Sequence, residues 1–375
     1  MNERTVLVLP TWYPTARQPL SGPFIRDHAR AAAAFGHRVV VFVDEGPSVA
    51  VRGLFELSEA RDGNLRVVRF TYRRGVGRVA HLPAVLAVSR RLAREGTPVD
   101  VVHAHIHRMA LPAAIVGALL RRPFVVTENS SEWARGTITP GALRRARFAF
   151  PRAALVCPVN ERLRQAIEGW GVRARFRVVP NTVDTTVFHP AVGQSGPPER
   201  LVNVALHVEV KALDVLLRAF ARVEGDLRLD LVGDGPLTPD LKALAREFGL
   251  EERVEFAGRK TPSEIAETLR ASHVFVLSSL SENMPLAVLE ALCCGLPVAA
   301  TDVGGVPEAV GDDGSLAPAG SPEALATAIA DVLDRYERFD RQDIARRAAA
   351  RWSFEAVGAV WDEIYRSLGA RQSPT

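Results

Sequence analysis

Two glutamates eight positions apart, Glu282 and Glu290, stand on either side of a proline, Pro285. The β-branched and aromatic run from residue 271 to residue 277 predicts a buried strand before them. Pro285 suits the first turn of a helix and Asn283 suits its cap, so a helix is expected directly after the strand. Glu282 would then lie in the strand-to-helix turn, where free N–H groups attract an anion, and Glu290 further down the helix. The stretch predicts a phosphate-binding turn between two carboxylates; a loop acid and a solvated helix residue are the alternative.

The residues that follow, Ala291 to Pro297 and Asp302 to Glu308, extend the pattern. The whole block closely resembles the C-terminal signature of the retaining nucleotide-sugar glycosyltransferases of family 4 (glycosyltransferase group 1). That family carries the same pair of glutamates. The resemblance implies that Glu290 holds the ribose hydroxyls of the donor and that Glu282 holds its sugar. It also implies that backbone N–H groups of the turn contact the diphosphate, over the residues Asn283, Met284, Pro285 and Leu286.

The resemblance implies an α/β chain with the GT-B fold, in which two Rossmann-like, doubly wound domains face a cleft. Apolar strand patterns alternating with helical patterns in both halves agree with parallel sheets. We expect an acceptor-binding domain over residues 1–190 and a nucleotide-sugar-binding domain over residues 191–350. The Pro-, Gly- and Ser-rich run from residue 190 to residue 198 is the expected linker. Residues 351–375 would form a C-terminal helix that crosses back to the first domain.

Charge is divided unevenly along the 375 residues. Residues 1–190 hold 28 arginines and no lysine against 14 acidic residues, a net charge of +14, whereas residues 191–375 carry −10. A basic half indicates an anionic partner such as a phospholipid surface, a polyprenyl-diphosphate lipid or a nucleic acid. No nucleic-acid-binding signature supports the last of these, so we expect no nucleic-acid partner. Arginine usage that reflects genome composition is the alternative explanation.

No segment is long and apolar enough to span a bilayer, and the N-terminus lacks the pattern of a signal peptide. The three cysteines are odd in number and have no zinc spacing, which favours reduced, packed thiols in a cytosolic protein. Arg144, Arg145 and Arg147 lie among phenylalanines, a composition that suits either an anionic membrane surface or a helix of the domain's shell. We therefore expect a cytoplasmic protein, peripheral at the inner face of the membrane if that surface is used.

In the N-terminal half, Gly22 precedes a helical run, where it either lets backbone amides approach a ligand phosphate or makes a turn. Three histidines, His103, His105 and His107, follow a buried strand on one face. No neighbouring acid or cysteine completes a metal site, so we expect no metal, and His105 or His107 would line the cleft. Asn129 stands where many family members have a histidine near the reacting carbon. Its amide cannot titrate but could donate a hydrogen bond to the donor sugar.

In the C-terminal half, the family pattern is Gly-Arg-Leu followed by Lys-Gly, whose Arg and Lys clamp the diphosphate. Here Ala205, Leu206 and His207 occupy the first three positions, Lys211 is retained, and Ala212 replaces the second glycine. A leucine cannot supply the paired donors of a guanidinium, so the clamp would rest on Lys211 with His207. The turn at Gly233 would border the nucleotide. Arg259 would stack on or neutralise the nucleotide, or simply belong to a solvated loop.

The chain is expected to be a retaining glycosyltransferase that moves a sugar from a nucleotide-diphosphate donor to a saccharide, lipid-linked or small-molecule acceptor. The catalytic set would be Glu282, Lys211, Asn129 and His105, without a metal or another cofactor. The competing interpretation is a catalytically impaired GT-B homologue that serves as a binding subunit for nucleotide-sugar or saccharide, which Asn129 and Leu206 favour. A nucleotide-sugar epimerase with the same fold is a third alternative.

Overall fold

The computed structural model describes residues 3–15, 21–191 and 197–369. The chain forms two compact units, one of residues 1–182 with 354–375 and one of residues 183–353. We call them the N-terminal unit and the C-terminal unit. The chain passes between them after Thr182 and again after Ser353, and the predicted boundaries followed residues 190 and 350. Most of the predicted linker, residues 192–196, lies outside the described part of the chain.

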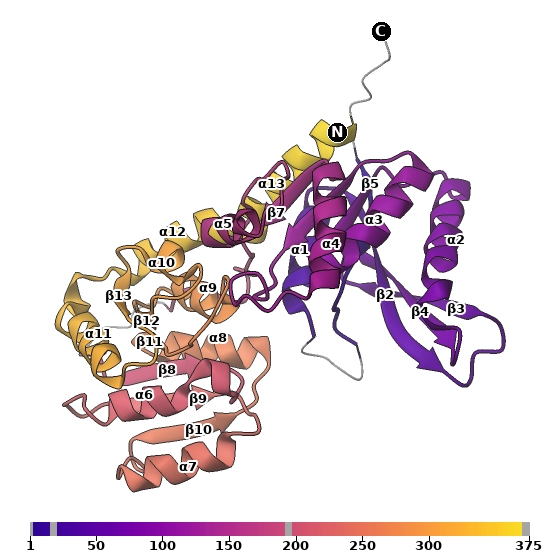
Figure 1. The fold of residues 1–375 in the computed structure, drawn as a ribbon. Coiled ribbons are helices and arrows are strands. Elements are labelled where there is room, and N and C mark those ends of the chain that lie inside the picture. Colours follow the sequence, from indigo (N-terminus) through magenta and orange to yellow (C-terminus); the bar gives the residue numbers. More distant parts are fainter. Residues whose placement is uncertain (1–2, 16–20, 192–196, 370–375) are drawn as a thin grey trace. The chain divides into compact units, whose positions relative to one another are not determined.

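The N-terminal unit is built on a seven-stranded sheet of order β3-β4-β2-β1-β5-β6-β7 (Figure 1). All neighbouring strands are parallel except β3, which is antiparallel to β4. Every residue of β1, β5 and β6 is buried, so these strands do not alternate between apolar and polar residues; their polar residues, the histidines of β5 and Thr127 and Glu128 of β6, are buried as well. The strands are β1 Thr5–Leu9, β2 Arg38–Ser48, β3 Phe55–Asp62, β4 Leu65–Arg73, β5 Val101–His105, β6 Phe124–Glu128 and β7 Leu155–Pro158.

The last helix of the chain completes the core of the N-terminal unit. Trp361 and Tyr365 of this helix, α13, join the buried cluster formed by strand residues and by Ile25 of α1. Helices α1 and α13 lie side by side (Figure 1). Gly358 allows this close packing, because a Cβ at this position would lie 2.5 Å from the carbonyl oxygen of Ala31. The helical segments of this unit are α1 Pro23–Ala34, η1 Gly77–Ala80, α2 His81–Arg94, α3 His107–Leu120, α4 Pro140–Ala149, η2 Phe150–Arg152, α5 Glu161–Gly169 and α13 Phe354–Gly369.

The C-terminal unit holds a six-stranded, all-parallel sheet of order β10-β9-β8-β11-β12-β13. Its strands are β8 Arg200–Val204, β9 Arg228–Val232, β10 Val254–Gly258, β11 Val274–Leu277, β12 Val298–Thr301 and β13 Gly314–Ala317. In a parallel sheet the carboxyl ends of the strands collect ligands. The loops after β8, β9, β11 and β12 therefore define the edge of this unit where a site is expected.

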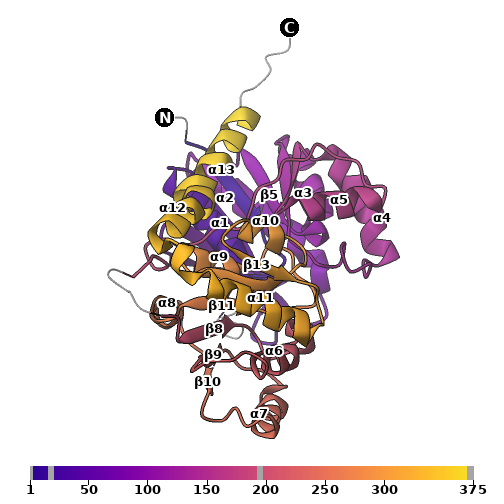
Figure 2. The same ribbon diagram turned by 90° about the vertical axis from the view of Figure 1, so that its left-hand side faces the viewer.

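Helices cover both faces of the second sheet. Leucines of α6, α7 and α11 pack into one buried cluster on one face, where α6 and α11 contact each other (Figure 2). Helices α9 and α12 pack against each other as well. The helical segments are η3 Glu209–Lys211, α6 Leu213–Phe220, α7 Thr238–Glu247, α8 Pro262–Ala271, α9 Leu286–Cys293, α10 Val306–Val310, α11 Pro322–Asp334, η4 Tyr336–Arg338 and α12 Arg341–Trp352.

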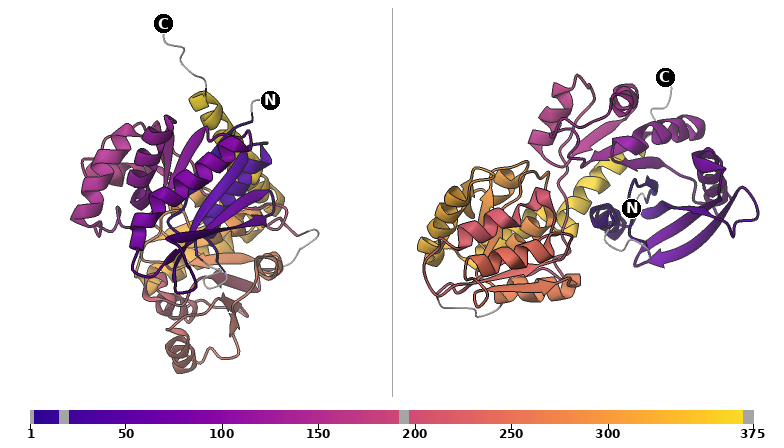
Figure 3. Two further views of the ribbon diagram at one scale, coloured as in Figure 1. Left: turned by 90° about the vertical axis from the view of Figure 1, so that its right-hand side faces the viewer. Right: turned by 60° about the horizontal axis from the view of Figure 1, so that its bottom comes forward.

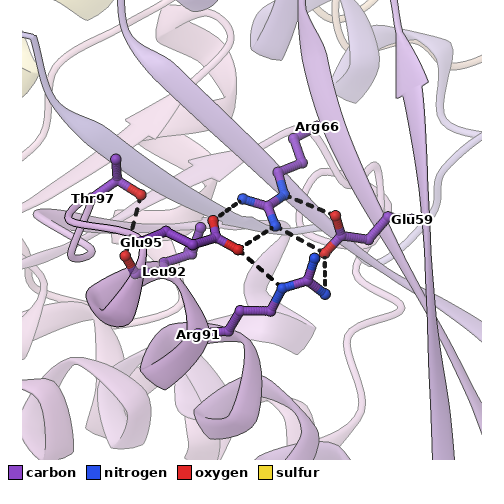
Figure 4. A network of polar contacts seen from close by, with 6 residues as sticks. All are labelled: Glu59, Arg66, Arg91, Leu92, Glu95 and Thr97. Carbon is purple, nitrogen blue, oxygen red and sulfur yellow. Dashed lines mark hydrogen bonds and ion pairs between the residues drawn. The ribbon is translucent and has the colours of Figure 1, made fainter.

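The sheet edge of the N-terminal unit is a hairpin, β3 and β4, which extends beside the long strand β2 (Figure 3). Four charged residues tie this hairpin to α2 (Figure 4). Arg66 of β4 donates to Glu59 of β3 and to Glu95 after α2, and Arg91 of α2 reaches both acids. Hydrogen bonds from Arg66 hold the pKa of the Glu95 carboxyl at about 2. The network fixes a strand whose own residues are mostly exposed.

Two further expectations can be compared with the structure. The run from Phe176 to Pro180, whose apolar pattern also predicts a strand, lies beside β7 with backbone hydrogen bonds from Arg177 to Val156 and from Val179 to Pro158, but it forms a single bridge, Phe176 with Val156, rather than a full strand. The cysteines Cys157, Cys293 and Cys294 are free and buried, as predicted. Within the described residues, no helix has the length and apolarity needed to cross a membrane.

Candidate functional site

The turn between β11 and α9 brings an acid and a lysine together. Lys211, at the end of η3, donates to Oε1 of Glu282, and the Ser279 hydroxyl donates to the same oxygen over 2.8 Å. The two charged side chains are 23% and 11% exposed, so both reach the surface of the unit. The Ser278 hydroxyl also donates to the backbone carbonyl of Lys211 over 2.8 Å. Two separate hydrogen bonds thus hold Lys211 against the strand end that carries Glu282.

The start of α9 differs in detail from the prediction. Pro285 is the cap residue, with extended backbone (ψ 120°), rather than the first helical residue, which is Leu286. Asn283 is therefore not the cap residue, and Pro285 makes no side-chain cap hydrogen bond. Pro285 has no N–H and cannot contact a phosphate as a donor. Leu286 begins the helix, and its N–H belongs to the first turn, whose donors have no partner inside a helix.

Glu290 lies one turn further along α9 and is half-buried. Met284, before the helix, is almost fully buried and packs beneath the turn rather than facing solvent. Both glutamates of the predicted pair therefore belong to one strand–turn–helix element, with Glu282 in the turn and Glu290 on the helix. This is the local arrangement that their spacing predicts.

Three glycines allow the loops of this edge to approach one another. At Gly304, which has a positive φ of 52°, a Cβ would overlap the carbonyl oxygen of Glu282. At Gly233, a Cβ would overlap the carbonyl oxygen of Ala205, and Gly235 lies similarly close to His207. The turn at Gly233 was predicted to border the nucleotide. The close approach of Gly304 to the turn that carries Glu282 was not predicted. The double glycine after β12 was the sequence signal for it.

The segment after β8 carries the residues that depart from the family pattern. Leu206 is 49% exposed, unusual for a leucine. His207 is buried, its Nδ1 lies 2.8 Å from Oγ1 of Thr238, and burial lowers its pKa. Ala212 adopts the left-handed conformation, with φ 45° and ψ 48°. An alanine is strained there and a glycine is not, which gives a physical reason for the glycine in the family pattern.

Arg259 lies at the same edge but is 64% exposed. Its Nε is 3.5 Å from Oδ2 of Asp234, whose other oxygen accepts from the Thr238 hydroxyl and the N–H of Gly235. Those hydrogen bonds lower the pKa of Asp234. Because an exposed ion pair is worth little, Arg259 can leave Asp234 for a ligand at small cost.

The N-terminal unit contains a cavity of about 410 Å³ beside the carboxyl end of β6. Asn129 belongs to its wall, and Nδ2 of Asn129 donates to Oδ1 of Asn181 over 3.2 Å. The wall residues are Trp12, Arg108, Asn129, Ser130, Ser131, Glu132, Arg135, Thr137 and Thr139. A larger hollow of about 800 Å³ lies between α10 and α12 of the C-terminal unit, and its described lining includes none of the predicted site residues.

Glu128, the acid directly before Asn129, is fully buried and faces inward. One carboxylate oxygen accepts from the N–H of His107 over 2.7 Å and lies 3.2 Å from its Nδ1; the other accepts from the N–H of Ser130 over 2.8 Å. Glu128 therefore holds the loop that carries Asn129 instead of facing a ligand. His107 is also buried and serves the same network.

His105 lies in the core rather than at a surface. Its side chain is fully buried, its ring stacks on that of His103 at 4.3 Å, and neither ring nitrogen has a hydrogen-bond partner in the described part of the chain. Burial lowers its pKa well below the usual value. This position argues against the direct catalytic contact predicted for His105.

Gly22 is the cap residue of α1, with a positive φ of 65°. A Cβ there would lie 2.6 Å from the carbonyl oxygen of Trp12. The structure thus gives Gly22 a packing role beside a cavity residue, as part of a turn. The alternative role at a ligand phosphate stays a prediction.

Sequence comparison identifies the family. A model described as Glycosyltransferase Family 4 matches residues 22–187, and one described as Glycosyl transferases group 1 matches residues 198–335. The chain belongs to the family 4, group 1 glycosyltransferases. The two matches lie in both units of the glycosyltransferase. They include the turn and helix that carry Glu282 and Glu290, and the loop after β6 that carries Asn129.

Relatives of this glycosyltransferase agree with the assignment. It is 28% identical over 306 residues to the N-acetyl-alpha-D-glucosaminyl L-malate synthase of Bacillus anthracis, an alignment that covers 76% of this chain and 79% of the relative. It is 31% identical over 222 residues to the D-inositol 3-phosphate glycosyltransferase of Corynebacterium glutamicum, covering 53% of each chain. The chain spans about half the length of most of the curated relatives that it matches.

Solved structures identify the fold of the glycosyltransferase as GT-B. The sucrose-phosphate synthase of Thermosynechococcus elongatus superposes with a TM-score of 0.74 at 21% identity, over 98% of this chain and 100% of that one. Anabaena HepE in complex with UDP superposes with a TM-score of 0.75 at 20% identity, over 97% and 100%. The predicted fold class is confirmed.

Proposed function

We propose that this glycosyltransferase moves a hexose from a nucleoside diphosphate donor to an acceptor, with retention of the anomeric configuration. The observation that carries the proposal is the contact of Lys211 and Ser279 with Glu282 at the uncapped start of α9. A cation, a carboxylate and free helix N–H groups on one turn suit a ligand with both a diphosphate and a sugar. The solved HepE complexes contain UDP, UDP-glucose, or UDP with glucose, which supports such a donor.

Each side chain of the turn has a distinct part in this proposal. The N–H groups at the start of α9 and the Lys211 ammonium stabilise the negative charge that develops on the departing diphosphate. Glu282 accepts hydrogen bonds from the sugar, and Glu290 accepts them from the ribose hydroxyls. Positive charge develops on the sugar ring during glycosyl transfer, and a carboxylate beside the ring favours it. Asn129 donates a hydrogen bond through its amide and transfers no proton.

Lys211 must serve two anions in turn. Without a donor, it is neutralised by Glu282. A bound diphosphate would attract the ammonium and free the Glu282 carboxylate to accept from a sugar hydroxyl. Binding of the donor thus exchanges one ion pair for another, which limits the desolvation of either charge. The exposed Leu206 adds no donor, so Lys211 carries the part that two cations have in the family pattern.

Equilibrium titration of the whole chain with UDP-, GDP- and ADP-sugars tests the proposal, with release of nucleotide measured in parallel. Glu290→Gln should weaken nucleoside diphosphate binding by about tenfold or more, because a hydrogen bond to a charged group contributes about 1.5–3 kcal/mol. Glu267→Gln, an exposed glutamate of α8, is the matched control and should bind like the wild type. If no nucleotide-sugar binds at millimolar concentration, the proposal is wrong.

A binding subunit without turnover is the second candidate. It is favoured by Leu206 and Asn129, which stand where the family has an arginine and a histidine. Donor binding with no transfer and no hydrolysis, over a broad panel of acceptors, would support it over the enzyme.

We also propose that the N-terminal unit meets an anionic membrane surface from the cytoplasmic side. Helix α4 exposes Arg144, Arg145 and Arg147, with Phe148 49% exposed beside them. A guanidinium, that of Arg152, lies 3.9 Å above the Phe148 ring. Replacing Arg144 and Arg145 by glutamine should reduce sedimentation with phosphatidylglycerol vesicles but not with phosphatidylcholine vesicles. Equal sedimentation of variant and wild type would contradict the proposal.

A further inference from the structure

The cavity of about 410 Å³ in the N-terminal unit has a wall of unusual composition. The wall holds an exposed tryptophan, Trp12, and two arginines, Arg108 and Arg135, together with a set of hydroxyl and amide groups. The volume lies near the lower end of the range for ligand pockets, about 300–1,000 Å³. Such a cavity suits a compact molecule of monosaccharide size.

We infer that the acceptor is a compact hydroxyl compound that carries a phosphate or a carboxylate, bound in this cavity by Arg135 and Arg108. The inference rests on the proposed function, because it takes the bound molecule to be the acceptor of the transfer. It goes beyond that function by naming the charged group that distinguishes acceptors from neutral sugars.

Arg135 is the first support. Its guanidinium has no ion-pair or hydrogen-bond partner among residues 3–15, 21–191 and 197–369, although it belongs to the cavity wall. A guanidinium presents five N–H donors in a planar fork that matches the oxygens of a carboxylate or phosphate. Arg135 is exposed, so a ligand that binds it has no bond to the fold to break. Arg135 therefore offers a complete set of donors to a ligand.

Arg108 is the second support. It is 53% exposed and shares the carboxylate of Glu132 with His107, whose Nε2 lies 3.4 Å from Oε2 of Glu132. Its contact to Glu132 uses one terminal nitrogen, Nη2, so the rest of the fork stays available. Two guanidinium groups face a single carboxylate in the wall, and the balance is positive. The buried carboxylate of Glu128 does not offset it, because Glu128 points inward to backbone N–H groups.

Hydrogen bonds hold the two loops that carry Trp12 and Ser130. The hydroxyl of Thr11 donates to the carbonyl of His105 over 2.8 Å, and Gly22 lies against the carbonyl of Trp12. On the opposite wall, Glu128 holds the N–H of Ser130. Because both walls are anchored, little ordering is needed on binding. The exposed indole of Trp12, 42% accessible, offers a flat apolar surface to the carbon skeleton of the ligand.

A neutral sugar would be a poor ligand for this wall. It would displace water from two guanidinium groups and offer them only neutral hydroxyl oxygens as acceptors. The free energy of hydration that the guanidinium groups lose would then be replaced only in part. A site built around a charged or polar group rejects the analogue that lacks it. The wall therefore selects for charge, and the hydroxyl side chains of Ser131 and Thr137 suit the polyol part.

Three probes that differ only in the charged group test the inference: glucose 6-phosphate, glucuronate and glucose. Binding to the full chain is measured by ligand-observed NMR titration, with nucleotide binding measured on the same samples. We expect both anions to bind at least about tenfold more tightly than glucose, or about 1.4 kcal/mol. Arg135→Gln should remove this preference, and Arg90→Gln, an exposed arginine on α2, should keep it. Trp12→Ala should weaken all three probes alike.

Vesicles of phosphatidylglycerol distinguish a lipid headgroup from a free anion. If Arg135→Gln weakens vesicle binding and Arg90→Gln does not, the anion belongs to a lipid; if only the soluble anions respond to Arg135→Gln, it belongs to a free metabolite. Either result supports the inference. Equal affinity for glucose and its anions, or equal effects of the two variants, overturns it, even where nucleotide-sugars bind normally. Loss of nucleotide-sugar binding with preserved anion preference would instead refute the proposed function.

Discussion

Glu282→Gln should have opposite effects on the two forms of the donor. In the ligand-free protein the Glu282 carboxylate neutralises Lys211, so it competes with a diphosphate for the ammonium group. The amide of a glutamine keeps the shape and a hydrogen bond to Ser279 but loses the charge. A free nucleoside diphosphate should therefore bind the variant more tightly. A nucleotide-sugar should bind it more weakly, because its sugar loses a charged acceptor.

The magnitudes follow from the exposure of the pair. Two unit charges 4 Å apart attract by about 4 kcal/mol at an effective dielectric constant of 20. Lys211 is 23% exposed, and solvent screening together with the remaining amide dipole reduces the competition to roughly 1 kcal/mol, about fivefold in Kd. A hydrogen bond to a charged acceptor contributes about 1.5–3 kcal/mol. Relief of the competition at Lys211 tightens both ligands by the same factor, so it cancels in the ratio of the two Kd values. The lost hydrogen bond to the sugar should change this ratio by about 10- to 150-fold.

Isothermal titration of the wild type, Glu282→Gln and the control Glu267→Gln with a nucleoside diphosphate and the matching nucleotide-sugar measures this ratio. Thermal unfolding of each protein checks that it is folded. If Glu282→Gln weakens both ligands by the same factor, the carboxylate does not discriminate the sugar. The exchange of ion pairs at Lys211 would then be wrong.

Three further outcomes follow from the structure. Gly304→Ala should lower the thermal midpoint and displace Glu282. Gly311→Ala is the control, because its φ of 50° is similar but no atom lies within 4 Å of its Cβ, so it should show only the smaller backbone penalty. Equal losses in thermal midpoint would contradict the close approach at Gly304. Ala212→Gly should raise stability by up to about 1 kcal/mol by removing the strain at φ 45°, and a clear loss in chemical denaturation would argue against that strain. Burial lowers the pKa of His28 to about 4, so between pH 6.5 and pH 4 His28 is protonated in the unfolded chain but neutral in the folded chain. Stability should fall between pH 6.5 and 4 by at most about 1.4 kcal/mol per unit from this group, and a His28→Gln variant should show a shallower slope of thermal midpoint against pH.

Much of the fold could be predicted because its strands are short apolar runs between turn residues. The apolar run before Pro10 is strand β1, Thr5–Leu9, and the helical run expected after Gly22 is α1, Pro23–Ala34. Strand β3 was missed because its residues are largely exposed and polar, and it is held by the Arg66 network with α2 rather than by burial. A segment fixed by charges far away in sequence leaves no periodic signal.

The candidate site was predictable where spacing sets geometry, and not where distant loops meet. Glu282 and Glu290 fall on one strand–turn–helix element, so their separation in sequence determines their placement. The burial of His105 could not be foreseen, because its ring packs on His28 and His103, whose other neighbour is Trp361 of the last helix. The cavity was missed for the same reason, since Trp12 and Arg135 come from separate loops.

Helix α13 has a consequence for how the protein is made. Its Val357, Trp361, Ile364 and Tyr365 belong to the buried cluster of the N-terminal unit, although they are translated after the whole of the C-terminal unit. The first domain therefore leaves the ribosome without α13, and the apolar side chains that α13 covers stay exposed until residues 354–369 have been made. The second domain, whose residues are continuous from 183 to 353, can finish folding earlier than the first. A nascent chain that stalls before residue 354 would leave those apolar side chains exposed to chaperones or to aggregation.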